Sequence, residues 1–168
     1  MKWEIVSSTG EWAAAIAVVV TLFYLARQIR QSNQLGIAAS ERGFFDAWHD
    51  IVRNLGSDTA VGGIIQRGFL DYKSLRSEEK IVFHTRVSGV FNQADLARRL
   101  HDKDLISVDI VNGVLSVCLG IVLTKGGGDW WDEMGETFPI YDYFESHGRK
   151  LSHVGPLDEL SPWIAGDT

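Results

Sequence analysis

The chain has 168 residues, which is enough for one domain and short for two, and its single cysteine, Cys118, cannot form a disulfide within the chain. The net charge of −6 argues against a nucleic-acid binder, because phosphate contacts require a cationic surface, and against attachment to anionic lipid by charge alone. All three prolines lie at position 139 or later, and no earlier region alternates cleanly between apolar and polar residues. These features predict an all-α fold.

A stretch without formal charge runs from Trp12 to Ala26, within the sequence GEWAAAIAVVVTLFYLARQIRQSN. As a helix it rises about 22 Å, against a hydrocarbon core of about 30 Å, and the residues that follow lengthen it. A capping box of the form S-x-x-E precedes the stretch and favours a helix start near Thr9. We therefore predict one transmembrane helix over about residues 9–29.

The flanks of this stretch predict how it lies in a membrane. Aromatic rings favour the interface, and arginine stems can lift their charge out of the lipid, so the predicted membrane-anchoring residues are Trp12, Tyr24, Arg27 and Arg30. Positive charge precedes the stretch only at Lys2. By the positive-inside rule the N-terminus lies outside and the larger C-terminal part lies in the cytoplasm, as in a single-pass protein of a bacterial inner membrane.

Three other interpretations of the stretch stay open. A signal peptide would need a basic start and a small-residue cleavage site, and both are missing before the charges. A buried core helix of a soluble protein has a similar length and composition. An amphipathic surface helix fits less well, because the stretch is apolar on all sides.

Residues 37–55 are predicted to form a helix that continues from the first, with Gly36 as its weakest point. Its apolar stripe consists of Phe44, Trp48, Ile51 and Leu55. A short helix over 57–70 and a loop over 71–76 follow; three glycines weaken the prediction for that helix.

The clearest helical pattern begins at Ser77, which we predict to be its N-cap, and ends before a turn at 101–104. One face of this helix carries Phe83, Val87, Val90, Ala94 and Ala97. The next helix runs from about residue 107 to residue 124 and is uncharged from Ile110 onward. We predict that it is the central core helix of a bundle; a second membrane span is the alternative.

The glycines at 126–128 are expected to end that core helix, and Asp129 to cap a short turn that carries two tryptophans. A final short helix is predicted to start at 137–139 and to stop at Gly148.

The predicted organisation has three parts. Residues 1–34 form an N-terminal segment with the transmembrane helix, residues 35–149 form a cytoplasmic bundle of about four or five helices, and residues 150–168 form a flexible tail.

No residue pattern predicts a catalytic or metal site. Asp46 and His49 have the spacing of one half of a bundle di-iron site, but no second pair follows, and His84 and His101 do not share a helix face. Two His-Asp dipeptides are too short to indicate a phosphohydrolase, and the glycine run lacks the G-K-S/T of a phosphate loop. We expect no enzymatic activity, no metal and no cofactor.

The pair Trp130–Trp131 is the most distinctive local feature and has two interpretations. The favoured one is a hydrophobic clamp, in which two large rings close the open end of the bundle. The other is an aromatic contact for a partner or for lipid headgroups.

Two motifs and their order resemble a widespread group of short, uncharacterised bacterial membrane proteins. Residues 24–31, YLARQIRQ, match the end of that group's N-terminal span, and residues 127–131, GGDWW, within GGGDWW at 126–131, match its late G-G-x-x-W-W element. The resemblance extends from about Gly10 to Phe144. It implies an N-terminal span followed by helices, and it supplies no activity and no catalytic residues. The chain departs from the group in the weakly charged SNQLGIAAS after the span and in the apolar character of residues 110–124.

These observations predict a non-catalytic accessory or assembly subunit of a larger membrane protein complex, or a self-associating membrane protein. Its predicted partners are the lipid bilayer and other membrane subunits, with no nucleic acid. Candidate partner contacts are the small residues Ala13, Ala14 and Ala17, which allow close helix approach, together with Trp130 and Trp131. The alternative is a sensor or enzyme with a ligand or metal pocket near His84, His101 and Trp130.

Overall fold

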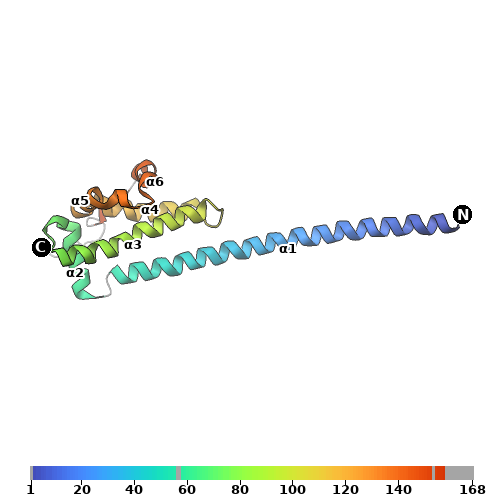
Figure 1. Cartoon of the computed structure of the whole chain (residues 1–168), viewed down its shortest axis with the longest axis horizontal. Coiled ribbons are helices and arrows are strands. Elements are labelled where there is room, and N and C mark those ends of the chain that lie inside the picture. The colour runs from blue at the N-terminus through green and yellow to red at the C-terminus, as the bar shows by residue number, and fades with distance from the viewer. Residues whose placement is uncertain (1, 56–57, 153, 158–168) are drawn as a thin grey trace. The chain divides into compact units, whose positions relative to one another are not determined.

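The computed structural model describes residues 2–55, 58–152 and 154–157, with side chains from residue 16 onward. All regular secondary structure in these residues is helical, which confirms the predicted all-α fold (Figure 1). Contacts between residues divide the chain into two units, Met1–Ala39 and Ser40–Thr168, and we call the second the C-terminal unit.

The α-helices are α1 (Lys2–Leu55), α2 (Thr59–Asp71), α3 (Ser77–His101), α4 (Val108–Leu123), α5 (Lys125–Met134) and α6 (Tyr141–Ser146). In the described residues, the 3₁₀ turns η1 (Tyr72–Ser74) and η2 (Gly135–Thr137) lie between α-helices, and η3 (Gly148–Lys150) follows α6.

Helix α1 begins at Lys2, so the predicted start near Thr9 is wrong. The residues before the capping box are compatible with a helix, and each one added gains a backbone hydrogen bond without a new nucleation step. The helix also continues through Gly36, as predicted, because a glycine in a helix costs only about 1 kcal/mol.

In the C-terminal unit, α3 and α4 lie side by side and are joined by a short turn, while α2 and α5 pack against each other (Figure 1). The predicted face of α3 is confirmed, since all five of its residues are completely buried. Helix α4 contributes half of its length to the core, as predicted for a core helix; its buried residues are Val111, Val114, Leu115, Cys118, Leu119, Gly120, Ile121 and Val122.

The last part of α1 belongs to the C-terminal unit and supplies Phe44 to its core. The rest of the predicted stripe, Trp48, Ile51 and Leu55, is partly buried and packs against that core. The side-chain amide of Gln93 donates a hydrogen bond to the Phe44 carbonyl at 3.2 Å. A buried polar side chain on α3 is thereby satisfied by the backbone of α1.

The corner between α4 and α5 differs from the prediction. Helix α4 ends before Thr124, whose extended backbone (ψ 151°) breaks the helix. The Thr124 hydroxyl donates to the Ile121 carbonyl at 2.8 Å and accepts from the Gly127 N–H at 3.0 Å. Thr124 is therefore the N-cap of α5, and Asp129 is not a cap.

The predicted glycine terminator lies inside α5 instead. A methyl group added to Gly126 would lie 1.8 Å from the carbonyl oxygen of Gly68 on α2, and one added to Gly127 would lie 2.0 Å from that of Ile121. No side chain fits at either place. The glycines therefore allow backbones to approach closely, and the helix continues through them.

Candidate functional site

From Ile16 to Ala39, every side chain of α1 is exposed. We call residues 16–29 the apolar segment of α1. Over residues 16–39 the large hydrophobic side chains are between 37% and 74% exposed: Ile16, Val18, Val19, Val20, Leu22, Phe23, Tyr24, Leu25, Ile29, Leu35 and Ile37. The apolar run is unbroken by charge from Ile16 to Ala26, and such an exposed surface is unusual for a helix in contact with water.

Some of the predicted anchors and partner contacts lie in or beside this segment. Tyr24, Arg27, Arg30 and Ala17 are exposed. The side chains of Trp12, Ala13 and Ala14 lie outside the described residues.

The one hydroxyl of a Ser or Thr in the apolar segment is satisfied within the helix, because Thr21 Oγ1 donates to the Ala17 carbonyl at 2.8 Å. The Thr21 hydroxyl hydrogen is therefore bonded within the helix and does not require a water molecule as its partner.

Among the residues whose side chains are described, no single helix combines the length and hydropathy of a membrane span. Val108–Leu123 and Lys125–Thr137 together would do so by length and composition, but they are bent by 103° at the break between them.

Trp130 and Trp131 are 0% and 2% exposed, so both rings fill the interior of the C-terminal unit. Trp131 stacks on Phe91 with ring centroids 4.4 Å apart, and its indole N–H donates to Glu145 at 2.8 Å. Phe83, Phe138 and Phe144 complete the aromatic cluster around them. This burial agrees with the clamp interpretation, and it leaves neither ring on the surface as a partner contact.

The described histidines serve local structure. His49 Nδ1 donates to the Phe45 carbonyl at 2.9 Å, and His101 Nδ1 donates to the Ile106 carbonyl at 3.1 Å, because a carbonyl can only accept. His84 Nδ1 accepts the indole N–H of Trp130 at 3.3 Å, which places the proton of a neutral ring on Nε2.

An open cavity of about 390 Å³ lies beside His84 and is lined in part by Tyr72, Lys80 and Glu133. The Lys80 ammonium lies 4.7 Å from the centre of the Tyr72 ring. Burial, and secondarily the Glu133 charge, raise the pKa of Tyr72. His101 does not line this cavity, since it follows His84 by seventeen residues, or about 25 Å along α3.

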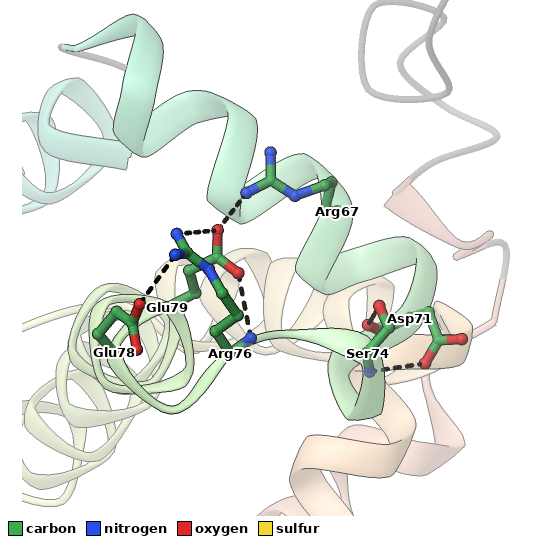
Figure 2. A network of polar contacts seen from close by, with 6 residues as sticks. All are labelled: Arg67, Asp71, Ser74, Arg76, Glu78 and Glu79. Carbon is green, nitrogen blue, oxygen red and sulfur yellow. Dashed lines mark hydrogen bonds and ion pairs between the residues drawn. The ribbon is translucent and has the colours of Figure 1, made fainter.

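A buried carboxylate in the first turn of α3, that of Glu79, organises the start of this helix. Figure 2 shows Glu79 between the guanidinium groups of Arg67 and Arg76. Its Oε2 also accepts the backbone N–H of Arg76 at 3.1 Å, so Arg76 and not Ser77 is the N-cap. These hydrogen bonds, that of the Arg76 backbone first, lower the pKa of Glu79 to about 2. The sequence signal for this group was an acidic residue in the first turn of a helix.

Two findings limit the chemistry of the described residues. They contain no group of three His, Cys, Asp or Glu side chains placed to hold a metal ion. Cys118 is completely buried, and this burial raises the pKa of its thiol.

No family model, curated protein or solved structure matches the sequence.

Proposed function

We propose that the protein is anchored in a bacterial inner membrane by a single span over about residues 9–29 of α1. Its helical C-terminal unit then lies in the cytoplasm and acts without catalysis, as an accessory or assembly subunit of a larger membrane protein complex. The observation that carries this proposal is the exposure of apolar side chains along residues 16–29.

The physical reason for this proposal is the unfavourable free energy of hydrating these apolar side chains. Covering one valine, leucine or phenylalanine side chain is worth about 1.5–3 kcal/mol, and this segment leaves a run of them uncovered. Val18, Val19 and Val20 are successive residues, so they point about 100° apart around the helix axis. A single partner helix covers one face, whereas lipid surrounds the helix. The internal hydrogen bond of Thr21 also suits an environment without water.

The binding role is supported by the small residues of the same helix. Ala13 and Ala17 are one turn apart, and side chains this small let a second membrane helix approach closely. The partner is another membrane subunit or a second copy of this chain.

Membrane insertion is tested with a charge in the middle of the span. Arginine at the centre of a span costs about 2.5–3.5 kcal/mol, so V19R should move the protein from the carbonate-washed membrane pellet toward the supernatant. The matched control is I81R, which places the same charge on an apolar residue that is 68% exposed in the C-terminal unit. Wild-type protein in the supernatant, or equal behaviour of the two variants, would contradict the anchor.

Orientation is tested with single cysteines on the two sides of the span. The buried thiol of Cys118 gives a silent background. With an impermeant maleimide on spheroplasts, S7C should be labelled and N33C should be labelled only after lysis. The reverse pattern would contradict the proposed cytoplasmic location.

Association is tested by native gels after extraction with mild detergent. The complex should be larger than a monomer, and A17L should reduce it. A26L is the matched control, since nine residues place it on the opposite side of the helix. A strictly monomeric wild-type protein without a co-purifying partner would contradict the accessory role.

The cavity beside His84 favours a second candidate function, a ligand-binding sensor or enzyme. It gathers an ammonium, a carboxylate, a phenol and an imidazole, which are groups that recognise small polar ligands. A metal or chromophore in the purified protein that is lost in H84A and kept in H101A would support this function. Protein without any bound species would favour the accessory role.

A further inference from the structure

A buried hydroxyl group without a hydrogen-bond partner lines the cavity beside His84. Tyr72 is only 3% exposed, and no other described residue forms a hydrogen bond with its phenol oxygen. Burial, and secondarily the Glu133 charge, raise the pKa of Tyr72, so the phenol keeps its proton at neutral pH and stays a donor. Buried polar groups are nearly always paired, because an unpaired one loses its hydration without compensation. The Tyr72 hydroxyl therefore calls for a polar partner within the cavity.

Two opposite charges that line the same cavity are also unpaired. Lys80 comes from α3 and Glu133 from the end of α5, and neither forms an ion pair with any described residue. The neighbouring charge at the start of α3 is neutralised, because Glu79 pairs with Arg67 and Arg76. A ligand that carries both a negative and a positive charge complements such a cavity.

Hydrogen-bond donors predominate in the lining and suit a carboxylate group of the ligand. The Lys80 ammonium lies 4.7 Å from the centre of the Tyr72 ring. Ser77 and His84 share its face of α3, since they lie three residues before it and four residues after it. The Nδ1 of His84 accepts the indole N–H of Trp130, which leaves Nε2–H as the donor of that ring.

The cavity also has an apolar part, to which Ile81 and Met134 contribute, and its volume of about 390 Å³ suits a small ligand. Building on the ligand-binding function considered above for this cavity, we propose that it binds an aliphatic α-amino acid. The carboxylate of the amino acid bonds to Lys80 and to the Tyr72 hydroxyl, its ammonium group pairs with Glu133, and its side chain contacts Ile81. This binding requires no catalysis and is therefore compatible with an accessory role.

Equilibrium dialysis of the full-length, detergent-extracted protein against radiolabelled L-leucine tests the proposal. Leucine should bind, and two analogues that each lack one charge should compete for the site at least about tenfold more weakly than unlabelled leucine. Isocaproate lacks the ammonium group and isoamylamine lacks the carboxylate, so each leaves one charge of the cavity unpaired. Competition by either analogue as strong as that by leucine would overturn the proposal, as would the absence of leucine binding.

Two matched pairs of substitutions locate the binding site. K80M and E133Q each remove one charge from the cavity and should weaken leucine binding by about tenfold. K103M and E136Q make the same changes at exposed residues that do not line the cavity, and they should leave the affinity unchanged. Glu133 is itself exposed, so E133Q is compatible with the fold. Equal affinities of the two variants within either pair would overturn the proposal.

Failure of the amino acid and failure of the ligand-binding function give different results. Protein that does not bind leucine, but carries another species that is lost in H84A, would overturn the amino acid and keep the ligand-binding function. Protein that neither binds leucine nor carries any bound species would contradict both.

Discussion

Helix α4 and the apolar segment of α1 have similar compositions and opposite surroundings. Helix α4 has one charged residue, Asp109, at its start, and residues 16–26 have none. Yet Leu115 and Cys118 of α4 are buried, while Val19 and Leu22 of α1 are exposed. Composition therefore indicates that a helix is apolar enough to be buried. Whether it is buried within the chain depends on the other helices that pack against it.

The two helices differ in burial because they differ in which other elements pack against them. Helix α4 is packed by α3, by α5 after the turn at Thr124, and by the chain over Gly120. Residues 16–39 of α1 have no comparable burial at any described position. This exposure is the observation from which the membrane anchor is proposed.

The difference between the two helices is tested most directly by truncating one leucine to alanine in each of them. L115A should lower the free energy of unfolding by about 2–5 kcal/mol, because it leaves a cavity in the core. L22A should change it by less than about 0.5 kcal/mol, since the Leu22 side chain is 60% exposed. Urea unfolding of the full-length protein in detergent measures both. A similar loss in the two variants would mean that α1 is packed as α4 is.

A smaller effect is expected where α2 and α5 touch through their backbones. G126A should cost about 1–3 kcal/mol, because the new methyl group meets the Gly68 carbonyl, which cannot move as a side chain can. G62A is the control in open space and should gain up to about 1 kcal/mol from its helix propensity. Urea midpoints measure both changes, and a G126A protein as stable as wild type would contradict the close contact.

The smallest effect concerns the pH dependence of the C-terminal unit. The pKa of Glu79 is lowered from an ordinary value of 4.5 to about 2, so its stabilising effect is complete above pH 4.5 and disappears as the pH falls toward 2. E79Q should lose this contribution at neutral pH and show a flatter acid limb in midpoints recorded from pH 6 to pH 2.

The matched control for that experiment is E78Q, in the same helical turn. Glu78 pairs with Arg76 at 3.0 Å but is mostly exposed, so its removal should leave the acid limb as in wild type. An identical profile for both variants would rule out Glu79 as the titrating group.

The sequence predicted the elements whose signal is periodic. The five apolar residues on α3 repeat at helical spacing, and burial follows from that repeat. That spacing located α3, while cap-type residues and an uncharged run located α2 and α4 to within a few residues.

What the sequence did not predict depends on contacts between distant elements. Glycines at 126–128 have a low helix propensity, so they indicated a helix end, and only the position of Gly68 shows why they are needed inside α5. The ion pair of Glu79 with Arg67 likewise joins α3 to α2. The partners of Trp130 and Trp131, such as His84 and Glu145, come from two other helices.

The aromatic cluster also gives the protein a built-in spectroscopic reporter. Trp131 is held at fixed angles to Phe91 and Phe144 in an asymmetric interior, an arrangement that produces near-ultraviolet circular dichroism. The far-ultraviolet signal, by contrast, counts all helical residues, of which the 54 in α1 are a large share. The ratio of the two bands therefore distinguishes a melted C-terminal unit from a melted α1 in one unlabelled sample.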